Sequence, residues 1–282
     1  MLYKEGYMLK TRLLKIKDND FKLEEAESIH DYLDDILLHI GDLDSQLRDD
    51  LIYSTLCYWI DEYQYFDNES LNKLTDSLIS DDYLFKNIGY VNEDVFTRSF
   101  SILTLSLILY YQKENPFLNT QKLSEIANLI LDYLEKEIDY RGFTEHGWAH
   151  GIAHCADAMH FLLNCTSDKD IYKHILTGIV SKLQVIDKPL TADEYERLAT
   201  PIVNNYIMTQ HIPIKDVILM FNQLKDIVSI KDTMHKFNAR MNTRNFIRSV
   251  YFRLDLIETP QSFLDGLTDI EKTLNPYHTD HE

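Results

Sequence analysis

Four of the chain's eleven histidines lie within Glu145–Phe161, interspersed with glycine and alanine. If this segment belongs to one helix, over residues 145 to 164, then His146, His150, His154 and Asp157 share one face, because residues three and four positions apart lie on the same side of a helix. Apart from its first residue, the segment has Asp157 as its only Asp, Glu, Lys or Arg, which indicates a buried helix. A buried polar group without a partner costs about 1 to 3 kcal/mol. We therefore expect the functional site along this polar stripe.

The spacing of His154 and Asp157 suits acid–base chemistry. A carboxylate three residues away can orient an imidazole, so that the ring acts as a general base or as a positioned hydrogen-bond donor. The candidate catalytic residues are therefore His150, His154 and Asp157. No nucleophile signature accompanies them, since Gly-x-Ser-x-Gly, the Walker A loop and Gly-x-Gly-x-x-Gly are all absent. A hydrogen-bond network that only fixes packing is the competing interpretation.

A metal ion is the weaker interpretation of the same histidines. His146 and His154 are eight residues apart, about 12 Å along a helix, whereas the ligands of one zinc ion all lie about 2.0 to 2.2 Å from it. His146 with His150, or His150 with His154, has the i,i+4 spacing of helical zinc ligands, but no Cys-x-x-Cys or second tight histidine pair supplies the remaining ligands. We predict no cofactor, and keep a single metal ion as the alternative.

The other side of this predicted helix is expected to pack in the interior. Gly147 and Gly151 form part of a small-residue stripe, which favours the close approach of a neighbouring helix. Trp148 is expected in the core.

Arg98 is the only charged residue between Asp94 and Lys113. A guanidinium in so apolar a helix needs an acid. Asp94, one turn earlier, offers an i,i+4 partner, and our hypothesis is that Asp157 on the histidine helix is the cross-helix partner. The pair is either an internal salt bridge that fixes the helix register or part of a clamp for an anion or carboxylate.

Helical periodicity extends over almost the whole chain and predicts an all-α protein of about 11 helices. Pro201 lies inside a helical pattern and predicts a kink. The predicted helices cover residues 20–40, 45–63, 69–80, 92–114, 119–139, 145–164, 169–186, 191–211, 213–227, 230–256 and 260–274.

A weak repeat places polar residues at corresponding helix starts. Asp50, Asp94, His146 and Glu194 are 44, 52 and 48 residues apart, about the length of a HEAT or armadillo unit. The expected fold is a right-handed α/α superhelix, with a single domain over residues 1–282 and the most motif-rich part at 45–200. If the register holds, one concave groove collects the candidate ligand-binding residues Arg98, His146, His150, His154, Asp157, Asp94, Glu194 and Arg197.

Charge and composition exclude several classes of partner. The chain carries 46 acidic and 28 basic residues, a formal charge of −18, which repels the phosphates of nucleic acids and anionic membrane surfaces. Its longest apolar run, Ile102–Tyr111, is far shorter than the ~20 residues of a membrane-spanning helix. The first residues show no secretory signal pattern, and the three cysteines lie in apolar helical sequence. We expect a cytoplasmic protein that binds neither nucleic acid nor membrane.

Several segments resemble a bacterial family, the domain of unknown function numbered 2785. The likeness spans about residues 45 to 200, and Gly-Trp-Ala-His at 147–150 is its most specific part. It implies a mostly helical, repeat-like intracellular protein and supplies no activity, cofactor or partner. The matching segments are Arg48–Leu56, Asp94–Ser101, Arg141–Gly142, Gly147–His150, Ala153–Asp157, Glu194 and Arg197–Ala199.

Two functions from different classes fit these observations. The first is a helical-repeat binding or scaffold protein whose groove receives a peptide or small molecule. The second is an acid–base or metal-assisted hydrolase-type enzyme that uses the same groove, with His150 as acid or base, His154 oriented by Asp157, and Arg98 holding an anionic group. The lack of a recognisable nucleophile or complete metal site favours the first.

Overall fold

The computed structural model describes residues 2–207 and 211–278. Within these residues the chain forms twelve α-helices, five π- or 3₁₀-helical segments and a single two-stranded hairpin. The prediction of an all-α protein is therefore confirmed.

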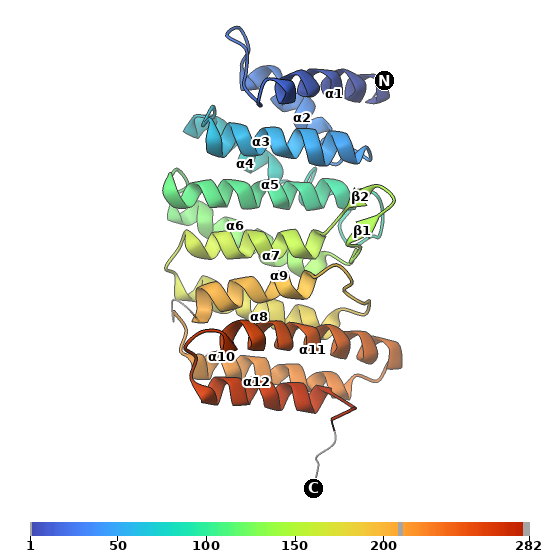
Figure 1. Ribbon diagram of the computed structural model, residues 1–282, viewed down its shortest axis with the longest axis vertical. Helices are drawn as coiled ribbons and strands as arrows, with labels where there is room; N and C mark the ends of the chain where they lie inside the picture. The colour runs from blue at the N-terminus through green and yellow to red at the C-terminus, as the bar shows by residue number, and fades with distance from the viewer. Residues whose placement is uncertain (1, 208–210, 279–282) are drawn as a thin grey trace.

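The helices stack in two layers along the long axis of the molecule (Figure 1). Successive helices of the first layer pack on one another, and the hairpin of β1 Phe143–Thr144 and β2 Gly147–Trp148 lies at one edge of this layer. The first layer consists of η2 Gln46–Tyr53 continued by α3 Ser54–Cys57 and η3 Tyr58–Glu62, then α5 Val95–Glu114, α7 Gly151–Asn164, α9 Glu194–Pro201 continued by η4 Ile202–Ile207, and α11 Thr233–Asp255.

The second layer covers one side of the first, and further helices close the two ends of the stack. The second layer consists of α4 Asn68–Leu78, α6 Thr120–Lys136, α8 Lys169–Val185, and α10 Ile214–Phe221 continued by η5 Asn222–Ser229. The end helices are α1 Leu2–Asp18, η1 Ile29–Asp31 and α2 Leu33–Leu38 at the N-terminal end, and α12 Gln261–Leu274 at the other.

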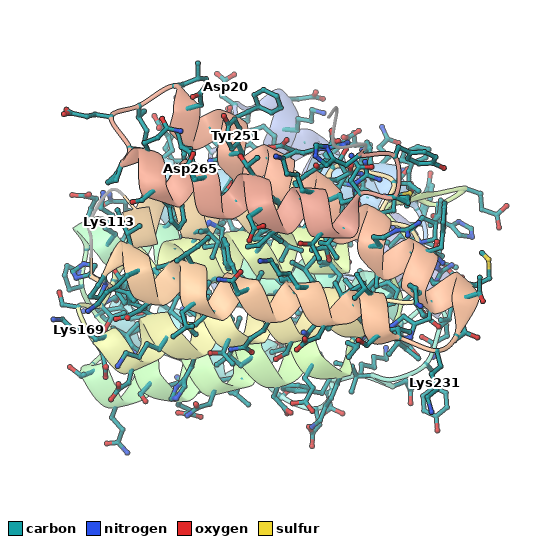
Figure 2. The ribbon with its side chains drawn as sticks, turned by 90° about the horizontal axis from the view of Figure 1, so that it is seen from below. Asp20, Lys113, Lys169, Lys231, Tyr251 and Asp265 are labelled. Atoms are coloured by element: carbon teal, nitrogen blue, oxygen red, sulfur yellow. The ribbon has the colours of Figure 1, made fainter. Side chains whose placement is uncertain are left out.

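Helices of the first layer begin at the hairpin edge. Figure 2, seen from the C-terminal end of the stack, shows Lys113 near the end of α5 and Lys169 at the start of α8 on one edge, with Lys231, just before α11, on the opposite edge. The first turns of α5, α7 and α11 therefore lie at the edge of the hairpin (Figure 1), which brings together residues that are far apart in sequence.

Two large apolar clusters form most of the core, and α5 contributes to both. Phe100 and Ile108 belong to the cluster formed with the N-terminal helices, while Ile102 and Leu105 belong to the larger cluster that extends to α12. The helix is buried along nearly its whole length, as expected of a helix that is apolar on all sides. Both the single domain and the right-handed superhelix stay predictions.

Most predicted helices are confirmed, often to within a few residues, as for α5 and α12. The helix predicted over 20–40 is wrong in its first half. Residues 2–18 form α1, a helix that was not predicted; Asp20 and Phe21, just after it, have positive φ, and a loop follows. The helix predicted over 191–211 begins only at Glu194, and its residues 208–210 lie outside the described part. At Pro201 the α-helical part of α9 ends and a π-helical segment continues it, because proline has no backbone N–H to donate to the i→i−4 hydrogen-bond ladder.

None of the helices in the described ranges is both long and apolar enough to cross a membrane.

Candidate functional site

The helix predicted over 145–164 is wrong in its first six residues. Phe143 pairs with Trp148 and Thr144 with Gly147 in an antiparallel hairpin, and α7 begins only at Gly151. Gly147 has φ +89° and His150 has φ 53°, conformations that cannot continue a right-handed helix. Thr144 Oγ1 accepts from the His146 amide at 3.0 Å and donates to the Gly147 carbonyl at 3.1 Å, which fixes the turn.

His146 consequently lies in this turn and not on the face of α7. Its ring meets Phe96 edge-on, with centroids 6.2 Å apart, and its carbonyl accepts a 2.8 Å hydrogen bond from Arg48 Nη2. Arg48 is fully buried, and its guanidinium lies over the rings of Phe96 and Phe100. Sequence reasoning missed Arg48, whose only signal was its place in a segment that resembles the family. Its role is to attach the hairpin to η2 and α5.

The hairpin presents an aromatic pair, Phe143 and Trp148, to solvent. The ring centroids lie 4.7 Å apart in an edge-to-face arrangement. Trp148 was expected in the core, but it is 47% exposed and Phe143 is 66% exposed, because both lie in the hairpin at the edge of the stack and not on a helix face (Figure 1). The Trp148 ring also meets His150, with centroids 4.4 Å apart.

Four predicted residues do come together, at the N-cap and first two turns of α7 and the first turn of α9. His150 and His154 have ring centroids 5.8 Å apart, and His154 Nδ1 lies 3.5 Å from Asp157 Oδ2. Arg197 on α9 donates to Asp157 from Nε at 2.8 Å and from Nη2. We call His150, His154, Asp157 and Arg197 the His–Arg site.

The ionisation of the His–Arg site follows from burial and from this ion pair. Burial lowers the pKa of His150 to about 4, assisted by His154 and Arg197, and burial also lowers the pKa of His154. Burial alone would raise the pKa of Asp157, but its contact with His154 and its hydrogen bonds from Arg197 outweigh burial and lower that pKa. The same bond to Asp157 raises the pKa of Arg197. At neutral pH the site therefore holds two neutral imidazoles beside a paired carboxylate and guanidinium.

Tyr53 of η2 borders this site and was not predicted. Its ring meets Phe100 edge-on, with centroids 6.4 Å apart. Burial, Cys57 and the negative charge of Asp157 all raise the pKa of the phenol, while Arg197 lowers it. The tyrosine therefore remains a neutral hydroxyl next to the ion pair, able to donate a hydrogen bond.

Glu194 reaches the His–Arg site from beneath the hairpin. Its Oε2 accepts from the Ala192 amide at 2.9 Å, but its Oε1 is buried and has no hydrogen-bond partner among the described residues. Burial raises the pKa of this carboxyl group. A Cβ on Gly142 would stand 2.8 Å from Glu194 Oε1 and 3.4 Å from His150 Cδ2, so the carboxylate and the imidazole face the same point of the backbone. His150 Nε2 is likewise buried and lacks a partner in the described ranges.

The predicted pairing of Arg98 with Asp157 is wrong. Arg98 donates to Glu137, just after α6, from Nε at 2.7 Å and from Nη2 at 3.1 Å, and both side chains are fully buried. It also donates to the carbonyl of Lys86 at 2.9 Å. Asp157 is held instead by Arg197, because both lie on the exposed side of the first layer whereas Arg98 points into the second. Of the two interpretations of Arg98, the geometry matches the internal salt bridge.

Asp94 does not join the His–Arg site either. Its Oδ2 accepts from the Asn87 side chain at 2.7 Å and its Oδ1 lies 3.3 Å from Lys86 Nζ, so the expected side-chain pair with Arg98 is absent from the described contacts. Asp94 lines a pocket at the N-terminal end of the stack. The repeat register therefore does not gather all the aligned positions in one groove.

The described geometry of the His–Arg site does not form a tight acid–base pair. Both carboxylate oxygens of Asp157 accept hydrogen bonds from Arg197, and the 3.5 Å between His154 Nδ1 and Asp157 Oδ2 is at the long limit of a hydrogen bond. An oriented acid–base pair is therefore weakly supported. No group of three or more potential metal ligands occurs in the described part of the chain.

A family model matches residues 84–252, and its description is Protein of unknown function (DUF2785). Comparisons with curated proteins and with solved structures gave no match.

Proposed function

The chain belongs to the DUF2785 family, whose description names no activity, and we propose from its own site that it is a peptide-binding protein of the cytoplasm. The binding surface consists of the aromatic pair and the His–Arg site. One observation carries the proposal: two exposed aromatic side chains of the hairpin pack on each other, and one of them, Trp148, also packs against the half-buried His150 ring, whose Nε2 is buried and has no partner among the described residues.

The aromatic pair supplies the anchor. Aromatic residues are enriched among those that provide most of the free energy at the centres of protein interfaces, because rigid rings bury a large area at little cost in side-chain entropy. The ring of Trp148 packs edge-to-face against both His150 and Phe143. It is therefore preorganised, and binding need not immobilise it.

The His–Arg site supplies the polar contacts. Arg197 uses Nε and Nη2 for Asp157, its side chain is 44% exposed, and its Nη1 is a further donor for a backbone carbonyl or a carboxylate. Neutral His150 contributes Nε2. Burying a polar atom without a partner costs free energy, which a hydrogen bond from a bound peptide would recover.

A peptide suits this surface better than a small molecule. Small-molecule sites are concave and enclose most of the ligand, whereas none of the three pockets we describe is lined by a residue of the His–Arg site or the aromatic pair. Exposed aromatic anchors beside hydrogen-bonding groups at helix ends are features of surfaces that recognise extended chains.

A photo-crosslinking experiment with a matched control tests this proposal. A benzophenone amino acid replaces Phe143, which is 66% exposed, and in a second protein it replaces Phe252 on α11, which is 65% exposed. Both proteins are irradiated in cells that contain the native partners, and crosslinked peptides are identified by mass spectrometry. A synthetic copy of any peptide found at position 143 is then titrated against the purified protein and against Trp148→Ala.

We expect a discrete polypeptide at position 143, absent at position 252, whose synthetic segment binds at least tenfold more weakly to Trp148→Ala. The same crosslinked species at both positions, none at position 143, or unchanged affinity in Trp148→Ala would overturn the proposal. A reaction product released from the titrated peptide would favour the acid–base enzyme instead.

A further inference from the structure

A pocket of about 840 Å³ lies at the N-terminal end of the stack, away from the residues of the His–Arg site. It is bordered by α1, by the connection between α2 and η2, and by the segment that leads into α5. Its volume lies within the range of small-molecule sites. We call it the α1 pocket.

The α1 pocket contains an oriented imidazole. His39 is 5% exposed, and its Nδ1 lies 2.9 Å from Asp42 Oδ2. Because an ionised carboxylate only accepts, Nδ1 carries the proton, and Nε2 of the neutral ring is an acceptor. Nε2 is buried and has no hydrogen-bond partner in the described ranges. Because Nδ1 is bonded to Asp42, Nε2 is the ring nitrogen that can accept a hydrogen bond from a ligand.

Two glycines hold this imidazole in place. A Cβ on Gly6 of α1 would stand 3.0 Å from His39 Cε1, and a Cβ on Gly41 would stand 2.4 Å from the backbone nitrogen of Thr97. The loop that carries His39 and Asp42 therefore packs directly on α5. The ring is fixed between this loop and α1, so its hydrogen-bonding direction is set before any ligand arrives.

The remaining walls define the chemistry of the occupant. Tyr7, Leu14, Leu38 and Leu43 are partly exposed apolar side chains that line the pocket, which calls for an apolar body of the ligand. The acceptors are His39 Nε2 and the nearby carboxylates.

Charge decides the head group of the ligand. Lys10 pairs with Asp44 and Lys86 with Asp94, so both lysines of the lining are neutralised by carboxylates. The Asp42 carboxylate contacts His39 and the Asp44 amide, while the nearby Arg48 guanidinium donates to the Asp42 backbone carbonyl and pairs with Asp49. The lining holds four carboxylates against two lysines. A cation is favoured here and an anion is not.

We infer that the α1 pocket binds a small organic amine, which donates from its ammonium group to His39 Nε2 and places its apolar body against Leu14, Leu38 and Leu43. This site is independent of the peptide surface proposed above.

Three matched probes test the inference on the full-length chain: 4-phenylbutylamine, 4-phenylbutanol and 4-phenylbutyrate, which share one apolar body. Binding is followed by ligand-observed NMR. His39→Asn keeps a donor near Asp42 and removes the Nε2 position. Leu43→Trp fills the pocket from its partly exposed rim without altering the core, so it stays informative if His39→Asn folds poorly. Asp50→Asn, outside the pocket lining, is the charge control.

We expect the amine to bind saturably and at least tenfold more tightly than the carboxylate, with the alcohol between them. Binding of the amine should fall at least tenfold in Leu43→Trp and His39→Asn, and stay unchanged in Asp50→Asn and Arg197→Met. Equal binding of amine and carboxylate, no saturable binding of the amine, or full affinity in Leu43→Trp would overturn the inference. Because Arg197→Met tests the peptide surface alone, failure of either proposal is distinguishable from failure of the other.

Discussion

Arg197 on α9 holds Asp157 on α7 through two hydrogen bonds, across 40 positions of sequence. This pair connects two consecutive helices of the first layer at the surface where the histidines lie. The Asp157 side chain is 17% exposed, so its charge depends on the guanidinium for much of its stabilisation.

Removing the guanidinium should therefore cost more stability than removing both charges. We expect Arg197→Met to lower the free energy of unfolding by about 1 to 3 kcal/mol, because it leaves a mostly buried carboxylate unpaired. The double variant Arg197→Met/Asp157→Leu should be less destabilised than Arg197→Met alone, and less than the sum of the two single variants by a coupling of about 1 kcal/mol or more. Urea denaturation of the four proteins measures this, and additive effects would contradict it.

The partner of Arg197 shows how far sequence reasoning reached. Helical periodicity located α7 and α9, and the i,i+3 spacing of His154 and Asp157 placed both on one face. Which arginine lies opposite Asp157 depends on how the helices are rotated in the stack. Arg98 was the expected partner, but it faces the second layer and Glu137, and a single sequence contains no signal for that rotation.

The hairpin shows a different limit. The apolar pattern of residues 145–150 is compatible with a helix, and it was the backbone at Gly147 and His150 that ended the helical path. Glycine adopts positive φ at no cost, but histidine adopts it only when the surrounding structure imposes it. Here the bonds from Ala149 N to the Gly142 carbonyl and from His150 N to the Arg141 carbonyl impose it, and these contacts are tertiary.

His150 should make stability depend on pH. Its pKa is about 4 in the folded protein and about 6.5 in the unfolded chain. Because the unfolded state binds the proton more tightly, stability is highest above pH 6.5 and falls as the pH drops toward 4. His150→Gln removes this contribution.

The expected signature is a difference between two proteins. When the pH is lowered from 7.5 to 5, the free energy of unfolding of His150→Gln should rise by about 1 kcal/mol relative to that of the wild type, a figure reduced for partial solvent screening. Denaturant unfolding at both pH values measures the gain. His154, whose pKa is also lowered by burial, remains in both proteins. A stability difference that does not change with pH would refute the assignment.

The Arg98–Glu137 pair should behave as a structural element and not as a ligand site. Arg98→Met should lower the free energy of unfolding by about 3 to 5 kcal/mol, because Glu137 would remain as a buried charge without its guanidinium. Replacing both residues, with Arg98→Met and Glu137→Leu, should cost clearly less. Peptide binding at the aromatic pair should be unchanged in whichever variant stays folded.

A second readout separates this role from a purely electrostatic one. Arg98 also donates to the carbonyl of Lys86, so its loss should speed amide hydrogen exchange in the segment that leads into α5. If exchange there is unaffected while stability falls, the guanidinium does not anchor that segment.

Gly142 should tolerate no side chain because there is no space for a Cβ, and Gly89 serves as a control for the conformational effect of replacing a glycine. A Cβ at Gly142 would stand 2.3 Å from Ala192 Cβ and 2.8 Å from Glu194 Oε1, whereas a Cβ at Gly89 would meet nothing within 4 Å but would sit at φ +85°. Gly142→Ala is thus a steric change and Gly89→Ala a conformational one. We expect losses of about 2 to 3 kcal/mol for the first and about 1 kcal/mol for the second.

The functional consequence should differ even more than the stability. To accept the methyl group of Gly142→Ala, the Glu194 carboxylate must move, and it faces the same point as the His150 ring. Crosslinking at position 143 and affinity for the crosslinked peptide should therefore fall in Gly142→Ala at temperatures where the protein stays folded, and persist in Gly89→Ala. Equal peptide affinity in the two folded variants would mean that Glu194 and His150 do not shape the binding surface, and the aromatic pair alone would then account for recognition.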